Sequence, residues 1–143
     1  MPLKIIDHHS KEYRQMIQLR DEILRKPLGL YFDPEEIRQE KNDLLIGAFE
    51  EDKLIGCCML TATNPKTCRL RQMAVSRNLQ KKGIGASIIS FAENVARDRG
   101  YHTIIMHARK SAIGFYQKFG YIISGNEFEE VTLPHYIMKK ELR

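Results

Sequence analysis

The most constraining feature of the sequence is the stretch VSRNLQKKGIGAS, residues 75–87, which places two glycines between a strand-like run and a helix-like run. Glycine normally lowers the stability of such a junction, because it loses the most conformational freedom on folding. The first amides of a helix have no internal partners and, together with the helix dipole, form an anion site. Glycines at positions 83 and 85 would leave those amides open to a phosphate, and Lys81 and Lys82 would add charge suited to a pyrophosphate.

The segments on either side of this loop predict a parallel β-α-β unit. Residues 67–75 alternate as a strand, and residues 86–99 carry apolar side chains at helical spacing, with Gly100 placed as a C-terminal cap. Residues 101–108 are typical of a short buried strand. Strand, loop, helix and strand in this order connect two parallel neighbours of one sheet.

The rest of the chain predicts further strands and three further helices. We expect strands at 3–7, 44–50, 54–62, 121–125 and 133–142, and helices at 10–25, after Asp33-Pro34, and at 110–120. The predicted fold is α/β (α+β): a mixed, mostly antiparallel sheet of about six to seven strands, with a central parallel β-α-β unit and helices on both faces. A length of 143 residues fits one domain, residues 1–143.

Composition narrows the possible partners. A formal charge of +5 favours an anionic partner, whether nucleic acid, a phosphorylated small molecule or an acidic surface. The basic residues form short islands, and no predicted helix carries a run of Lys and Arg with exposed aromatics, so nucleic acid is disfavoured. No apolar run approaches the ~20 residues that cross a bilayer, and no signal segment is evident, so we expect a cytoplasmic protein with no membrane partner. The cysteines at positions 57, 58 and 68 have no zinc-ligand spacing, so we expect free, buried thiols and no metal.

Other glycine loops fit the stretch less well. A nucleoside-triphosphate loop requires G-x-x-x-x-G-K-[ST], and no lysine followed by Ser or Thr stands after the second glycine. The dinucleotide fingerprint G-x-G-x-x-G fails because residue 88 is Ile. A role of the two glycines in helix entry alone is the plainest alternative.

Two motifs resemble those of a known family. The pattern V-x-x-x-x-Q-x-x-G-x-G-A, residues 75–86, resembles the acyl-coenzyme A pyrophosphate loop of the GNAT superfamily of N-acetyltransferases. The stretch HARKSAIGFYQKFGY, residues 107–121, resembles the second motif of that superfamily, and NEFEEVTLPHYIMKKEL resembles the last hairpin of a group of small bacterial GNAT proteins. The order and length of the elements match as well, so the resemblance covers nearly the whole chain.

The resemblance implies acetyl-coenzyme A (acetyl-CoA) as co-substrate and identifies the residues that would bind it. In the superfamily the strand before the loop carries a bulge and diverges from its parallel neighbour, which leaves amides free for the pantetheine arm and the thioester. Arg109 stands where the superfamily often has Asn, so it would pair instead with phosphate or with a substrate carboxylate. The expected cofactor-binding residues are Met73, Ala74, Val75, Gln80, Lys81, Lys82, Gly83, Ile84, Gly85, Ala86, Arg109 and Tyr116.

The resemblance also implies the catalytic groups. Tyr116 matches the tyrosine that donates to the coenzyme sulfur, and a phenol that titrates near 10 is protonated at neutral pH. An amine with a pKa near 10.4 must lose a proton before it attacks, and Glu130 and His135 on the last hairpin are the expected acceptors of that proton. Glu129 and His107 remain alternatives, and each of the four also has a plain reading as a solvated or hydrogen-bonded side chain.

The implied function is transfer of an acetyl group from acetyl-CoA to a primary amine of a small molecule or peptide, by direct attack in a ternary complex. The alternative is a non-catalytic acyl-CoA-binding regulatory module. Acceptor choice should come from the first two helices and the loop between them, where Tyr31 and Phe32 either line a cleft or anchor the core. His8 and His9 are expected at the surface. A homodimer is left open, because superfamily members often dimerise.

Overall fold

The sheet of the protein follows the predicted plan with one additional strand. The computed structural model describes residues 1–80 and 82–143, and these contain an eight-stranded sheet in the order β1-β2-β3-β4-β5-β8-β6, with β7 paired to β8 beside this path. Every neighbouring pair is antiparallel except β4 and β5, so the mixed, mostly antiparallel sheet is confirmed. The strands are β1 (Leu3–Ile6), β2 (Leu44–Glu50), β3 (Lys53–Asn64), β4 (Thr67–Val75), β5 (Thr103–Arg109), β6 (Ile122–Ile123), β7 (Phe128–Glu130) and β8 (Leu133–Glu141).

The expected number of strands, six to seven, was too low because β7 is only three residues long. It pairs with the start of β8 around a turn in which Val131 and Thr132 both have positive φ angles. Neither residue is a glycine or an asparagine, the usual signals of such a turn. The family resemblance placed this segment on a last hairpin, but the sequence pattern did not predict the short strand itself.

The first two helices begin where the sequence predicted. The Ser10 hydroxyl accepts the amide of Tyr13 at the start of α1 (Lys11–Arg20), and the Asp33 carboxylate accepts the amide of Glu35 at the start of α2 (Pro34–Gln39). The helix expected to reach residue 25 changes at Asp21 into a π-helical turn, Asp21–Arg25, followed by a 3-10 turn, Lys26–Leu28. Pro27, which has no amide hydrogen to donate, lies in the second turn.

The two helices that follow the glycine loop and β5 differ in length. The first, α3 (Ile84–Asp98), follows the glycine loop and ends before Gly100, as predicted. The helix expected at 110–120 is shorter: a 3-10 turn, Lys110–Ala112, leads into α4 (Ile113–Gln117). No helix of the described chain combines the length and apolarity needed to cross a bilayer.

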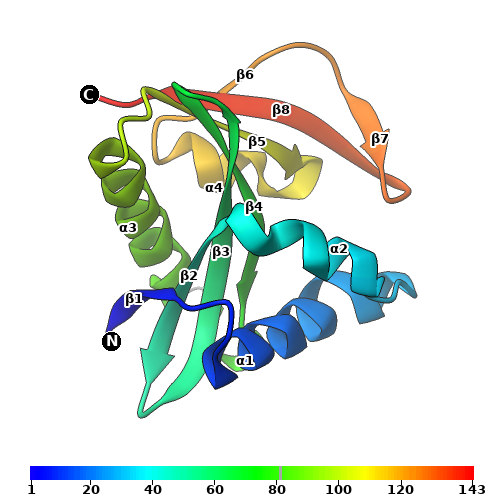
Figure 1. The fold of residues 1–143 in the computed structure, drawn as a ribbon. Helices are drawn as coiled ribbons and strands as arrows, with labels where there is room; N and C mark the ends of the chain where they lie inside the picture. The colour runs from blue at the N-terminus through cyan, green and yellow to red at the C-terminus, as the bar shows by residue number, and fades with distance from the viewer. Residues whose placement is uncertain (81) are drawn as a thin grey trace.

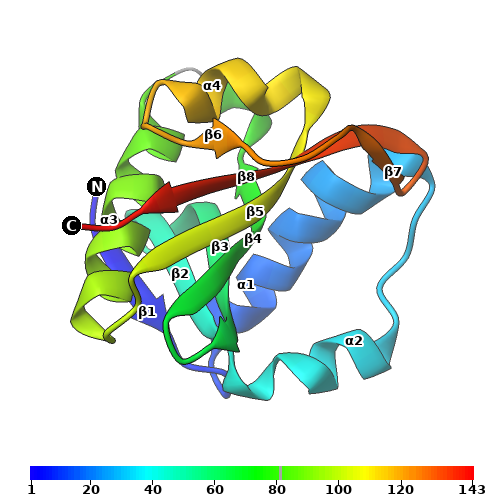
Figure 2. The same ribbon diagram turned by 90° about the horizontal axis from the view of Figure 1, so that it is seen from above.

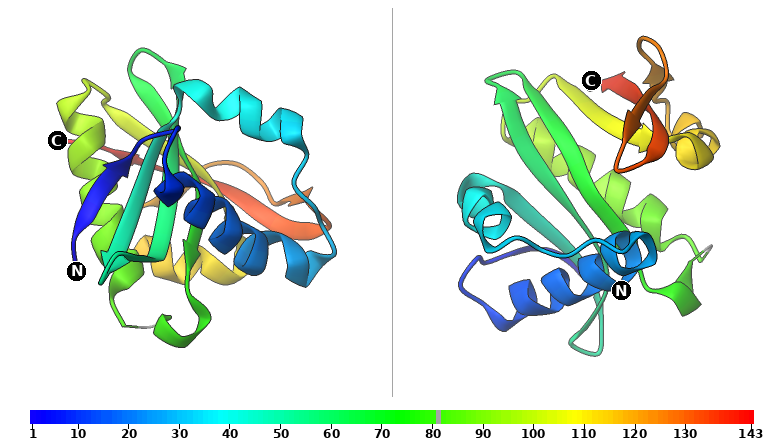
Figure 3. Two further views of the ribbon diagram at one scale, coloured as in Figure 1. Left: turned by 60° about the horizontal axis from the view of Figure 1, so that its bottom comes forward. Right: turned by 90° about the vertical axis from the view of Figure 1, so that its right-hand side faces the viewer.

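The helices cover both faces of the sheet. Figures 1 and 3 show α1 and α2 on one face and α3 on the other. One buried core lies between α3, α4 and the sheet, and a second lies between α1 and the opposite face. Cys57, Cys58 and Cys68 are buried free thiols, as predicted, and burial raises the pKa of Cys57 to about 12.

The parallel pair β4 and β5 separates partway along its length. Residues 67–69 pair with residues 103–105, and beyond this point the structure records no pairing between the two strands. The register between β3 and β4 also shifts near Gln72, whose φ angle is +57°, which is the geometry of a bulge. Figure 2 shows the β7–β8 hairpin and the segment that joins α1 to α2 at the same end of the sheet.

Candidate active site

A cleft of about 930 Å³ opens where β4 and β5 separate. It is lined by residues from the turn after α1, from β4, from the glycine loop, from β5 and α4, and from the β7–β8 hairpin. Eleven of the predicted site residues line it: Met73, Ala74, Val75, Gln80, Gly83, Gly85, Ala86, Arg109, Tyr116, Glu130 and His135. The Ile84 side chain is buried in the α3 core instead, Lys82 is exposed, and Lys81 lies outside the described residues.

The glycine loop ends in a helix start that carries no side-chain cap. Gly83 is the N-cap of α3 with a φ angle of +80°, and its carbonyl accepts the amide of Ser87 at 3.1 Å. No side chain of the described residues caps the amides that precede Ser87 in the helix. Gln80 ties the loop to the end of β4, since its Nε2 donates to the carbonyl of Val75 at 3.0 Å. These features leave the first amides of α3 available to an anion.

The two glycines have reasons beyond the approach of a phosphate. A positive φ angle such as that of Gly83 is strained for side-chain-bearing residues. A Cβ at Gly85 would lie 3.1 Å from Cζ of Phe115, so this glycine also makes room for an aromatic ring that lines the cleft. The sequence showed that bare backbone was needed here, but it did not show these two local causes.

The end of β4 presents backbone to the cleft. On one side Ala74 and Val75 stay paired with Cys57 and Gly56 of β3. On the other side β5 has already turned away, so residues 73–75 face the cleft with a strand edge. A strand edge presents unpaired amides and carbonyls that can bind an extended ligand.

Tyr116 brings a phenol into the same cleft. Its ring lies edge-on to Phe115 and Tyr121, with centroids 5.1 and 6.1 Å away, and the residue is 8% exposed. Burial, aided by the neighbouring Cys58, raises the pKa of Tyr116 well above its ordinary value. The hydroxyl therefore stays protonated at neutral pH, which is the state a proton donor needs.

A carboxylate and an imidazole form a pair on the opposite side of the cleft. His107 Nδ1 lies 2.9 Å from Glu130 Oε1 and 3.0 Å from Nη2 of Arg69. One ring nitrogen cannot donate to the first and accept from the second at once, so a protonated Nδ1 belongs to the contact with Glu130. Burial would raise the pKa of Glu130, but the hydrogen bond from His107 and the charges of His107, Arg69 and His135 outweigh it, and the net pKa lies below the ordinary value.

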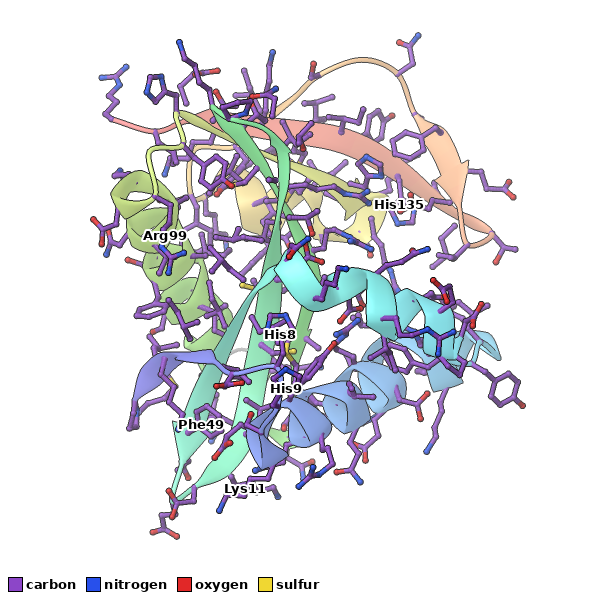
Figure 4. The ribbon with its side chains drawn as sticks, viewed as in Figure 1. His8, His9, Lys11, Phe49, Arg99 and His135 are labelled. Carbon is purple, nitrogen blue, oxygen red and sulfur yellow. The ribbon has the colours of Figure 1, made fainter. Side chains whose placement is uncertain are left out.

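His135 lies beside the other oxygen of Glu130. Its Nδ1 lies 2.9 Å from the carbonyl of Leu133, and its Nε2 lies 3.7 Å from Glu130 Oε2. Figure 4 shows His135 near the β7–β8 hairpin, and the residue is 4% exposed. Glu129, the open alternative next to Glu130, is exposed and is absent from the cleft lining. Of the four candidates, the structure therefore brings three together in the cleft: His107, Glu130 and His135.

Three arginines on the cleft wall were missing from the sequence-based site. Arg25 comes from the π-helical turn, and Arg69 and Arg71 come from β4. Cys68 and Leu70 point into the α3 core, so the alternation of a strand turns Arg69 and Arg71 to the α1 face. The alternating TCRLRQ sequence carried this signal, because charged residues at every second position of a central strand must face something other than the core.

The sequence left open whether Tyr31 and Phe32, between α1 and α2, line a cleft or anchor the core, and the structure gives the two residues different positions. Tyr31 lines the cleft and is 85% exposed. Phe32 is an anchor: the guanidinium of Arg25 stacks over its ring at 3.5 Å, and that of Arg20 lies 5.0 Å away. The expectation of a surface position holds for His9 but not for His8, which is half-buried and whose Nε2 lies 2.9 Å from the carbonyl of Glu40.

A buried ion pair behind this wall holds α1 to the turn that follows α2. Arg20 is fully buried and contacts both carboxylate oxygens of Glu40, which also accepts the hydroxyl of Tyr13 at 2.7 Å. Breaking a buried pair leaves an uncompensated charge, so this contact fixes the position of the helices rather than taking part in chemistry.

The split sheet and the helix start opened by glycines place a strand edge and uncapped helix amides in one cleft. The chain belongs to the acetyltransferase (GNAT) domain family, whose model matches residues 18–142. Among its relatives, the uncharacterized protein YyaT of Bacillus subtilis (strain 168) is 37% identical over 76 residues, which are 53% of this chain and 51% of YyaT. The match thus spans about half the length of that relative.

Solved structures support the same fold at lower identity. An aminoglycoside 6'-N-acetyltransferase complexed with coenzyme A superimposes with a TM-score of 0.85 at 19% identity, covering 100% of this chain and 98% of that chain. A GNAT family acetyltransferase from Elizabethkingia anophelis with acetyl-CoA bound superimposes with a TM-score of 0.76 at 19% identity, covering 99% and 97%. The expected GNAT-like architecture is therefore confirmed.

Proposed function

We propose that this protein transfers the acetyl group of acetyl-CoA to a primary amine by direct attack within a ternary complex. One observation carries the proposal. A single cleft joins the uncapped start of α3, the buried phenol of Tyr116 and the Glu130–His107 pair. A phosphate site, a proton donor and a proton acceptor along one cleft are the groups that this reaction needs.

The residues at the α3 end of the cleft fit the coenzyme. A pyrophosphate would accept hydrogen bonds from the backbone amides at the start of α3, where Gly83 and Gly85 carry no Cβ to obstruct it. The pantetheine arm is an extended chain with amide groups, and the free edge of residues 73–75 is complementary to it. A thioester bound in this way supplies the acetyl group, and Arg109 at the end of β5 is half-buried and lines the same cleft.

Tyr116 would stabilise the leaving group. When the amine nitrogen bonds to the acetyl carbon, the carbon–sulfur bond breaks and the electron pair stays on sulfur. The raised pKa of Tyr116 keeps its hydroxyl protonated, so the hydroxyl can donate a hydrogen bond to the departing thiolate. The thiol itself titrates near 8.5, so the thiolate can afterwards take a proton from solvent.

His107 would accept the proton of the amine, with Glu130 as its positioning residue. With Nδ1–H donated to Glu130, the lone pair of a neutral imidazole lies on Nε2, for which the described residues offer no hydrogen-bond partner. The carboxylate then stabilises the imidazolium that forms. Glu130 thus keeps a positioning part in the proposed chemistry, His135 Nε2 lies 3.7 Å from its second oxygen, and the transfer itself moves to His107.

The acceptor would be an amine of a small molecule or a peptide. We also propose a cytoplasmic setting, because the three thiols of the chain are free and disulfides are rare in reducing compartments.

Two measurements on the same protein test the proposed function. Calorimetric titration with acetyl-CoA should give saturable binding, and addition of an amine panel should release free thiol at a rate that depends on amine concentration. Binding without thiol release from any amine would contradict the enzyme and favour the regulatory acyl-CoA-binding alternative. Absence of binding would contradict both.

A further inference from the structure

The end of the cleft away from the glycine loop carries more positive than negative charge. Among the described residues that line the cleft, three arginines assigned to this end, Arg25, Arg69 and Arg71, face two glutamates, Glu36 and Glu130. Glu130 is already engaged by His107 at 2.9 Å. Glu36 lies 3.5 Å from Arg25, and half of its side chain is exposed. The cleft therefore carries surplus positive charge on the side where the acceptor would enter.

The guanidinium groups of Arg69 and Arg25 are partly buried and therefore partly dehydrated. Burial, together with the nearby charge of Arg71, lowers the pKa of Arg69, and burial together with Arg20 lowers that of Arg25. The Nε of Arg69 is buried and finds no acceptor among the described residues, so the protein leaves part of this guanidinium unsatisfied. Arg71 is better compensated, because it donates to Thr61 and lies near the buried carboxyls of Asp43 and Glu40.

We infer that the acceptor is an amine that also carries an anionic group, a carboxylate or a phosphate, which docks against Arg69 and Arg25. This inference rests on the proposed function and specifies its substrate class. Arginine binds both anions through paired N–H donors, so the two share one recognition chemistry. An acceptor with a second positive charge would instead be repelled by these arginines.

The positive wall also favours the chemistry of the amine itself. Nearby positive charge disfavours the ammonium form and therefore increases the fraction of neutral, nucleophilic amine. That effect alone would also weaken binding of a simple alkylamine. An anionic group on the same molecule offsets the repulsion and holds the nitrogen near His107, which lies beside Arg69.

The test separates binding from turnover. Protein loaded with coenzyme A, which has no acetyl group to transfer, is titrated by calorimetry with four amines of similar length: 4-aminobutanoate, 3-aminopropylphosphonate, butylamine and 1,4-diaminobutane. We expect at least one of the two anionic amines to bind about tenfold more tightly than butylamine, and the diamine to bind most weakly. The two anionic arms distinguish a carboxylate from a phosphate-like group.

Variants assign the effect to the arginines. Arg69→Gln and Arg25→Gln should each reduce the preference for the anionic amine by about tenfold, and Arg69→Lys, which keeps the charge but loses the paired donors, should reduce it less. Arg99→Gln is the matched control, because Arg99 is exposed on the far side of the molecule at the end of α3 (Figure 4). The affinity of each variant for coenzyme A checks that its cleft is intact.

Three results overturn the inference. The first is equal or tighter binding of butylamine or the diamine, and the second is no detectable binding of either anionic amine. A loss of coenzyme A affinity in Arg69→Gln and Arg25→Gln would also overturn it, because the arginines would then serve the coenzyme. Failure of the proposed function looks different: an anionic amine binds with the expected preference, yet acetyl-CoA releases no thiol in its presence.

Discussion

The two ends of the cleft are built from different materials. At the α3 end the binding groups are backbone amides, exposed by Gly83 and Gly85 and by the strand edge at residues 73–75. At the other end they are side chains, with Arg69, Glu130 and His107 in mutual contact. Backbone amides have the same chemistry whatever residues surround them, so they suit a ligand common to a whole family. Side chains change with one substitution, so they suit the acceptor that distinguishes one member from another.

The largest expected effect comes from obstructing the backbone end. Gly85→Val should weaken acetyl-CoA binding by about 100-fold, because its side chain both meets Phe115 and covers the amides that would hold the pyrophosphate. Calorimetry with acetyl-CoA measures the loss. Gly85 is a cleaner choice than Gly83, whose positive φ angle makes any substitution strained.

The matched control is the same change at a neighbouring helical glycine. Gly114 lies in α4, and a Cβ there meets no atom of the described residues within 4 Å. Gly114→Val should bind acetyl-CoA within about twofold of the unmodified protein. Equal losses at Gly85 and Gly114 would mean that the backbone end of the cleft is not the coenzyme site.

The next largest effect concerns Tyr116, which lies between the two ends. Tyr116→Phe should lower kcat about 100-fold and leave acetyl-CoA affinity nearly unchanged, because only the departing thiolate needs the hydroxyl. Tyr121→Phe is the control: its hydroxyl donates to buried Glu93 at 2.9 Å, so its loss should cost about 1–3 kcal/mol of stability without a comparable fall in kcat. Equal kcat values for Tyr116→Phe and the unmodified protein would remove the acid role.

The two ends also differ in how far the sequence predicts them. Gly83, Gly85 and Gln80 lie within six residues of one another, and the requirement for bare backbone is a local property, so the loop and the helix after it follow from the sequence. The β4–β5 separation was expected from the family resemblance. The same local reading predicted the helix that begins at Ser10 and the helix that follows Asp33.

The side-chain end could not be assembled in this way. Arg25, Arg69, His107 and Glu130 are spread over more than 100 residues, and only the sheet order β4-β5-β8, with β7 paired to β8, brings the strands of the last three together. Arg25 reaches the cleft because the helix expected through residue 25 changes into a π-helical turn. Sequence reasoning therefore chose Glu130 and His135 from the right hairpin but could not determine which imidazole Glu130 contacts.

A pH series sharpens the assignment of Glu130. The folded pKa of Glu130 lies below its unfolded value, so its contribution to stability is present above the unfolded pKa and is lost as the pH falls through the lower folded pKa. Glu130→Gln should therefore be less stable than the unmodified protein near pH 7, and the gap should close below about pH 4. Chemical denaturation across this range measures the gap.

The same variant should lower kcat/KM by about tenfold at pH 7, because His107 loses the carboxylate that stabilises its imidazolium. Glu129→Gln controls for a change on the same strand, since Glu129 is exposed and does not line the cleft. If the difference in stability between Glu130→Gln and the unmodified protein did not depend on pH, the Glu130 carboxylate would not be stabilised by the charges of Arg69 and His107.

The smallest effect is expected at Tyr31, on the rim of the side-chain end. Tyr31 is 85% exposed, so Tyr31→Ala should change the free energy of unfolding by less than about 0.5 kcal/mol. Because Tyr31 lines the cleft, Tyr31→Ala should raise the KM for the amine about threefold and leave the affinity for acetyl-CoA unchanged.

Phe32→Ala, one residue along, should instead lower stability by about 1–3 kcal/mol, because it removes the ring under Arg25. If Tyr31→Ala altered coenzyme binding as much as acceptor binding, the two ends would not be independent sites, and the division of labour between backbone and side chains would be wrong.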